Sequence, residues 1–118
     1  MKYKDEDAQR VALMVMETVN AYKRAVHLPE TPIDIQSQRF KSVVAGVLEL
    51  WDNPEVSPAE NHDKWVERMK SDGWVYGYEV DEVTRTHPAL LDYHDVPPFY
   101  KVNDLLFLNI VRSNFPNG

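Results

Sequence analysis

Apolar side chains recur at steps of three and four residues over the first part of the chain, which is the spacing of one face of a helix. The positions on this face are Ala8, Val11, Val15, Val19, Tyr22 and Val26. Acidic residues at 5–7 and basic residues at 23, 24 and 27 suit the two ends of a helix dipole. The pattern predicts a first helix that starts near Asp5 and ends before the sequence HLPETP.

Two further helices follow from apolar spacing and from their terminal residues. We expect the second to begin between Thr31 and Asp34, with Thr31 as its cap, and to end at Asp52–Pro54. Its predicted buried face consists of Phe40, Val43, Val44, Val47, Leu48 and Trp51. The third helix has a capping box at Ser57 and Glu60, and Gly73 supplies its left-handed end.

Beyond Gly73 the period changes from helical to alternating. Trp74, Tyr76 and Tyr78 fall on one face of an extended segment, and an irregular stretch runs to about Pro98. The last helix is expected from Phe99 to about Ser113, and its sequence VNDLLFLNIV is apolar nearly all round, which predicts a central position. The predicted fold class is mainly α: a small four-helix domain with a short extended aromatic segment.

Length and composition narrow the possible functions. The 118 residues suit one domain over 1–118, with an N-terminal helical part at about 5–52. A net charge of −6 opposes binding to nucleic acid or to anionic membranes. The absence of cysteine, of an apolar leader and of a membrane-length apolar run favours a soluble cytoplasmic protein.

Motifs for catalysis are missing. The glycines form no phosphate-binding loop, and no GxSxG elbow is present. His62, His87 and His94 lack the spacing of a metal site with their neighbouring aspartates. We therefore expect no catalytic residue, no metal and no cofactor, and we do not expect an enzyme.

The aromatic segment has two interpretations. In one, Trp65, Trp74, Tyr76 and Tyr93 build a core wall between the third and fourth helices. In the other, the rings form a slot for a planar ligand whose charge is met by basic side chains. The candidate ligand-binding residues are Trp74, Tyr76, Arg85, His87, Tyr93 and Lys101.

From His62 to Asp104 the chain resembles the ryanodine receptor repeat, or RyR domain. The matching blocks are HDKW at 62–65, GWVYG at 73–77, Asp81 with Arg85, HPAL at 87–90, and Tyr93. The closing positions of the motif are Pro97, Lys101 and Asp104. Met69 stands where the family usually has lysine, so a site that depends on that lysine is not carried over to this chain.

The resemblance implies a mainly α fold over about 57–113 and a binding module without catalysis or channel activity. The motif residues expected to be structural are His62, Trp65, Gly73, Gly77, Asp81, Pro88, Pro97 and Asp104. Arg85 and Asp81 are expected to pair, and Lys101 and Asp104 to stabilise the start of the last helix. The expected partner is another protein or a small nucleotide-like ligand. A homodimer through the apolar VALMVM segment of the first helix is a further alternative.

Overall fold

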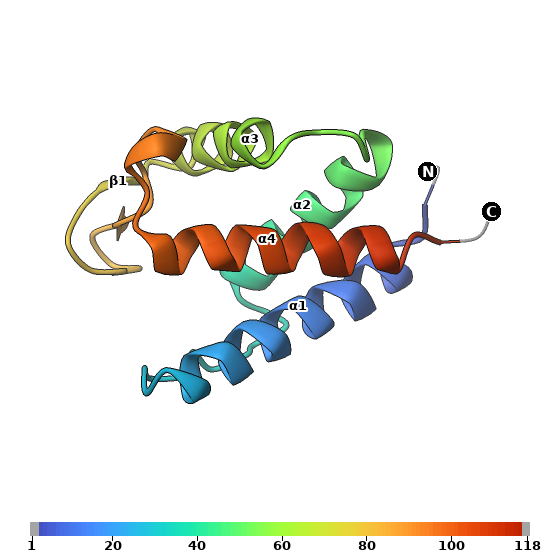
Figure 1. Ribbon diagram of the computed structural model, residues 1–118, viewed down its shortest axis with the longest axis horizontal. Coiled ribbons are helices and arrows are strands. Elements are labelled where there is room, and N and C mark those ends of the chain that lie inside the picture. Colours follow the sequence, from blue (N-terminus) through green and yellow to red (C-terminus); the bar gives the residue numbers. More distant parts are fainter. Residues whose placement is uncertain (1–2, 117–118) are drawn as a thin grey trace. The chain divides into compact units, whose positions relative to one another are not determined.

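A computed structural model describes residues 3–116 and confirms the mainly α fold (Figure 1). Four helices carry most of the described chain, and two very short strands and one 3-10 turn lie between the third and fourth. The elements are α1 (Asp5–Ala25), α2 (Gln38–Asp52), α3 (Pro58–Ser71), β1 (Val75–Tyr76), β2 (Thr86–His87), η1 (Tyr93–Asp95) and α4 (Pro98–Ser113).

Contacts within the chain group it into two compact units. The first contains the segment up to Glu55 together with the segment from Leu106 onward, and the second is Val56–Leu105. The residues of α4 are therefore shared between the units. A single domain over 1–118 stays a prediction.

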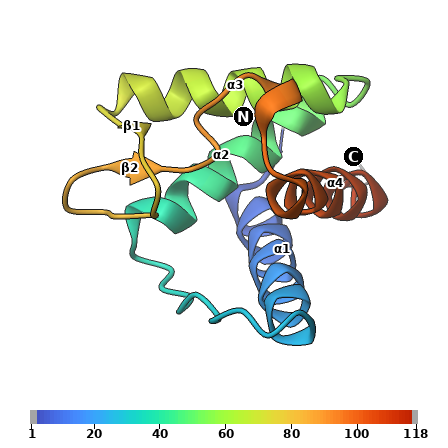
Figure 2. The same ribbon diagram turned by 60° about the vertical axis from the view of Figure 1, so that its left-hand side comes forward.

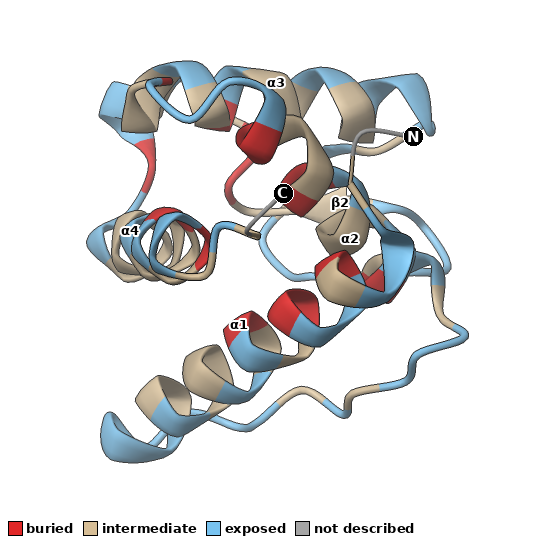
Figure 3. Cartoon of the chain, turned by 90° about the vertical axis from the view of Figure 1, so that its right-hand side faces the viewer, coloured by how far each residue is buried: buried red, intermediate tan, exposed pale blue. Residues whose placement is uncertain are grey.

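The first unit has its core along the N-terminal half of α1 and along α2. Ala8, Val11, Ala12 and Val15 are buried, whereas the C-terminal half of α1 is half-buried or exposed (Figure 3). Val26, expected on the buried face, is 44% exposed and lies just beyond the end of the helix. The predicted stripe is thus correct over the first three turns and wrong at its end.

Trp51 connects three segments of this unit. Its indole Nε1 donates to the carbonyl of Val111 at 3.1 Å, and its own carbonyl accepts from the Tyr3 hydroxyl at 3.2 Å. The Trp51 ring also contacts the rings of Tyr3 and Phe115, with centroid distances of 5.5 and 6.3 Å. Because Val111 lies in the last turn of α4, the indole satisfies a carbonyl that has little intrahelical bonding.

The predicted start of α2 is wrong. The helix begins at Gln38, and its cap is Ser37, whose hydroxyl accepts from the Phe40 amide at 3.1 Å. Thr31 instead exchanges two hydrogen bonds of 2.8 Å with the side-chain amide of Asn20 on α1. These bonds occupy the Thr31 backbone and keep it out of a helix.

The predicted ends of α3 are confirmed. The Ser57 hydroxyl accepts from the Glu60 amide at 3.1 Å, and the Glu60 carboxylate accepts from the Ser57 amide at 3.2 Å. At the other end Gly73 has φ of +89°. The amide of Trp74 donates to the Met69 carbonyl and that of Gly73 to the Lys70 carbonyl, both at 3.0 Å. This pair of bonds is a Schellman motif, which requires a left-handed residue.

The central position expected of α4 stays a prediction, although the helix is buried at few positions. Leu108 and Val111 are its only buried residues, and Leu105 is substantially exposed. The helix α4 therefore carries more apolar side chains than the described chain buries.

Candidate functional site

The second unit contains a connected group of rings that we call the ring cluster: His62, Trp65, His87, Tyr93 and Tyr100. Centroid distances are 5.5 Å from His62 to Trp65, 5.8 Å from His62 to Tyr93, 5.0 Å from Trp65 to His87, and 5.4 Å from His87 to Tyr100. Edge-on and tilted ring pairs at such distances are favourable. The cluster joins α3, β2, η1 and the start of α4.

His62 is the buried centre of this cluster, with 1% of its surface exposed. Its Nε2 lies 2.8 Å from the Leu91 carbonyl, so this nitrogen must carry a proton and donate. Its Nδ1 lies 3.5 Å from a carboxylate oxygen of Asp104 on α4. Burial disfavours the charged ring, but the bonds to Asp104 and Leu91 and the charge of Asp104 outweigh burial and raise the pKa of His62 above 6.5.

His87 fixes the turn that follows β2. Its Nδ1 accepts from the backbone amide of Ala89 at 3.0 Å, across the half-buried Pro88. The next residues, Ala89 and Leu90, are buried. His87 thus acts as a local backbone partner as well as a ring contact.

Pro97 and Lys101 lie at the start of α4. The Pro97 carbonyl accepts from the amides of Tyr100 and Lys101 at 3.0 and 3.2 Å, which forms the first turn of the helix. The Lys101 ammonium lies 5.0 Å from the centre of the Tyr93 ring, a cation–π distance.

The strands β1 and β2 lie beside each other (Figure 2). They pair in parallel, with Val75 opposite Thr86 and Tyr76 opposite His87. Gly77 follows β1 and passes very close to β2. A Cβ at Gly77 would lie 2.5 Å from the Cβ of Thr86, a separation that side chains do not tolerate. Glycine is therefore required here by close approach of the two segments.

Between the strands the chain forms a loop that extends away from them (Figure 2). We call residues 75–84, which include β1, the Tyr78 loop. The Asp81 carboxylate accepts from the amides of Val83 and Thr84 at 2.8 and 3.2 Å, and these bonds lower its pKa. The Asp81 and Thr86 backbones exchange two bonds of 3.1 Å, and the Thr86 hydroxyl donates to the Glu79 carbonyl at 2.9 Å. The loop therefore has a defined conformation.

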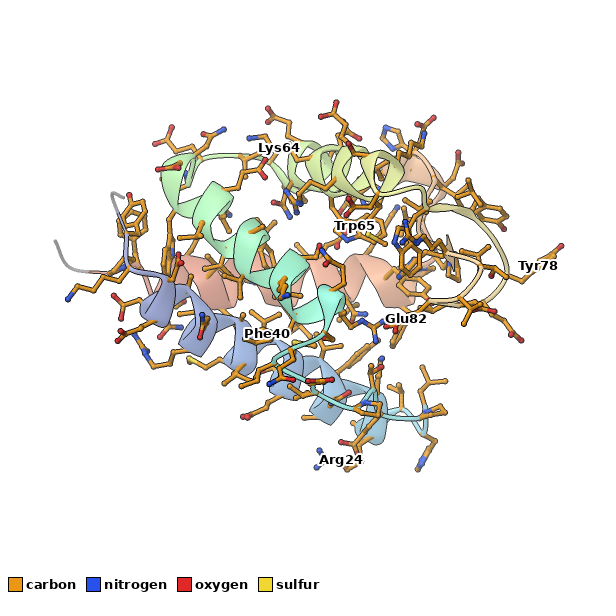
Figure 4. All side chains as sticks on the ribbon, turned by 180° about the vertical axis from the view of Figure 1, so that it is seen from behind. Arg24, Phe40, Lys64, Trp65, Tyr78 and Glu82 are labelled. Carbon is orange, nitrogen blue, oxygen red and sulfur yellow. The ribbon has the colours of Figure 1, made fainter. Side chains whose placement is uncertain are left out.

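The Tyr78 loop exposes large apolar side chains. Tyr78 and Val83 are each 92% exposed, and Val75, Tyr76 and Val80 are also exposed. Tyr78 extends outward from the loop (Figure 4), and its ring lies 6.5 Å from that of Tyr76. The interpretation of Tyr76 as part of a core wall is wrong, since half of its surface is open to solvent.

Arg85 directly follows the Tyr78 loop and has a left-handed conformation with φ of 57°. Its guanidinium donates to the carbonyl of Asp72 at the end of α3, and not to Asp81 as the sequence predicted. The side chain thereby connects the loop to the C-terminus of α3, whose carbonyls favour a cation.

The six candidate ligand-binding residues thus divide between different surroundings. His87 and Tyr93 belong to the ring cluster, Lys101 lies on Tyr93, and Arg85 contacts the end of α3. Tyr76 belongs to the Tyr78 loop, and Trp74 is half-buried beside it.

Sequence reasoning missed two features of this region. Tyr100 was not singled out, although it follows Phe99 at the start of a helix and contacts His87. Val80 and Val83 were not singled out either, although they are apolar residues within an acidic stretch, a pattern that signals exposure or a binding surface.

Within residues 3–116, no three His, Asp or Glu side chains come together in a way that could hold a metal ion. In the same part of the chain, none of the helices has the length and apolarity that crossing a membrane requires. No family model matches the chain, and no curated protein or solved structure matches it either.

Proposed function

We propose that this chain is a non-enzymatic binding module of the ryanodine receptor repeat type, and that it binds another protein through the Tyr78 loop. The observation that carries the proposal is the exposure of Tyr78 and Val83 on a loop with a fixed conformation. Exposed tyrosine is a frequent source of binding energy at protein interfaces. A loop that is already ordered loses little conformational entropy on binding.

The ring cluster supports this function by positioning the loop. His87 lies in β2, three residues after the loop, and it contacts Trp65 on α3 and Tyr100 on α4. Arg85 adds a second connection to α3 through the Asp72 carbonyl. In this proposal the motif shared with the RyR repeat is the support, and the loop is the contact surface.

A nucleotide-like ligand is the alternative that the sequence suggested. The groups expected to meet a phosphate are engaged within the chain: Arg85 with the Asp72 carbonyl, His87 with the Ala89 amide, and Lys101 with the Tyr93 ring. A phosphate would have to displace these contacts, and three acidic residues lie in the adjacent loop. These observations favour a protein partner over a nucleotide.

The test uses a random 12-residue peptide library selected against the full chain. The matched control is the double variant Tyr78→Ser/Val83→Ser, which removes exposed apolar surface and should keep the melting temperature of the wild type. Peptides that bind the wild type and not the variant are the expected result. Thermal-shift measurements with mono-, di- and cyclic nucleotides run in parallel.

The proposal fails if every selected peptide binds the double variant equally well. It also fails if a nucleotide raises the melting temperature and Arg85→Ala abolishes that rise. At 100 times its dissociation constant, a nucleotide would stabilise the fold by about 2.7 kcal/mol, so such a ligand would not escape detection.

A further inference from the structure

The Tyr78 loop combines its apolar side chains with a concentrated negative charge. Residues 75–84 contain Glu79, Asp81 and Glu82 and no basic residue. All three acidic residues are exposed. Among residues 3–116, Glu79 and Glu82 take part in no side-chain ion pair. The loop therefore carries two carboxylates that no cation of the described chain neutralises.

The positions of these carboxylates relative to the apolar groups follow from the sequence of the loop. Glu79 lies between Tyr78 and Val80, and Glu82 directly precedes Val83. Tyr78 and Val83, the most exposed large apolar side chains among residues 3–116, are thus each adjacent in sequence to an unpaired carboxylate. An apolar contact bordered by charge is the arrangement of an interface core and its rim.

The negative charge of the Tyr78 loop determines which kinds of partner can bind to it. A second copy of the chain carries a net charge of −6, so pairing acidic loop with acidic loop would be repulsive. Nucleic acid and anionic lipid surfaces are excluded by the same sign. A protein surface with lysine or arginine around an apolar pocket satisfies both the carboxylates and the apolar groups.

We infer that the partner of the Tyr78 loop is a basic protein segment, with an apolar pocket for Tyr78 and Val83 and with lysine or arginine facing Glu79 and Glu82. This inference rests on the proposed function of the loop as a protein-binding surface. Arginine fits the carboxylates best, because its planar guanidinium can form two parallel bonds to one carboxylate.

The experiment takes the peptides that bind the wild-type chain and not Tyr78→Ser/Val83→Ser, and measures their affinity for two charge variants by calorimetry. In Glu79→Gln/Glu82→Gln the loop loses its two unpaired carboxylates. In the control Glu17→Gln/Glu67→Gln, two exposed glutamates elsewhere are removed, so the net charge changes equally.

We expect the loop-dependent peptides to be rich in lysine and arginine. Two exposed ion pairs predict an affinity about two- to thirty-fold weaker for Glu79→Gln/Glu82→Gln, with the control unchanged. The difference between the two variants should shrink at 500 mM NaCl, because salt screens exposed charges.

The inference is overturned if the loop-dependent peptides are neutral or acidic, or if both charge variants weaken binding equally. In either case the loop would still bind protein, so the proposed function would survive. If no peptide depends on the loop at all, the proposed function itself fails, and the two outcomes are thereby separated.

Discussion

Replacing Gly77 by alanine should force β1 and β2 apart at the base of the Tyr78 loop. The new Cβ would lie 2.5 Å from the Thr86 Cβ, 2.9 Å from its Cγ2 and 3.1 Å from its Oγ1. Carbon atoms in favourable contact are about 3.5–4.0 Å apart. Rotation of the Thr86 side chain can move the Cγ2 and Oγ1 atoms, but the Cβ is fixed to the backbone, so the segments themselves must separate.

The expected cost is the difference between two opposing effects. Overpacking of this kind destabilises by about 1–3 kcal/mol. Alanine also has fewer backbone conformations than glycine in the unfolded chain, and this stabilises the folded state by about 0.4–1 kcal/mol where alanine can adopt the native backbone conformation. Gly77 is not among the residues with positive φ, so this offset applies. The net expectation is a loss of about 1–2 kcal/mol in the free energy of unfolding.

Urea denaturation of Gly77→Ala, Thr86→Gly and the double variant tests the cause directly. Thr86→Gly removes the Cβ that the new methyl group would meet, so Gly77→Ala should cost much less in that background. Gly73→Ala serves as a control, because its cost comes from a φ of +89° and should not depend on Thr86. If the Gly77 and Thr86 changes add to within about 0.5 kcal/mol, the steric explanation is wrong.

Three further predictions concern the two units separately. Because the pKa of His62 is raised above its unfolded value of 6.5, the stabilisation it contributes should be complete below about pH 6.5 and lost as the pH rises through the raised pKa. The difference in urea midpoint between the wild type and His62→Gln should therefore fall across that window, and a constant difference would contradict the ion pair with Asp104. His27 lies two residues beyond the end of α1 and has φ of 62°, a conformation that glycine adopts without strain. His27→Gly should therefore raise the melting temperature, by an amount equivalent to about 1 kcal/mol in the free energy of unfolding, whereas His27→Ala should not raise it. Trp51→Phe removes the donor to the Val111 carbonyl and should lower the free energy of unfolding by about 1–3 kcal/mol, measured by urea denaturation; a loss below about 0.5 kcal/mol would show that the bond contributes little.

The features that the sequence predicted well are those that neighbouring residues determine. The capping box of Ser57 and Glu60 closes within one helical turn. At the other end of α3, the amides of Gly73 and Trp74 donate to carbonyls three and five positions before them. The stripe through Val11 and Val15 needs only a regular helix and one covered face. Such signals are complete within a short window, so the sequence alone suffices.

The start of α2 was missed for the opposite reason. Thr31 and Pro32 form a reasonable helix start when only neighbouring residues are considered. The two bonds between the Thr31 backbone and the side chain of Asn20, eleven positions earlier, hold Thr31 in the connection, and the helix starts only at Gln38. A side chain that bonds backbone at that separation leaves no periodic signal in the sequence.

The aromatic segment shows why a single pattern could not settle its role. Trp65 lies on a helical face and was correctly expected near Tyr93, since both contact the buried His62. Tyr76 and Tyr78 are aromatic residues of a type that is common in cores, but the segment that carries them turns outward after the two residues of β1. That turn depends on the bonds of the Asp81 carboxylate to amides of its own loop and on glycine at position 77, where the chain passes close to Thr86. The pattern of apolar and polar positions in the sequence reveals neither requirement. The bonds of Asp81 hold the loop in a course that leaves the Tyr78 ring in solvent, and this exposed ring is what the proposed partner would contact.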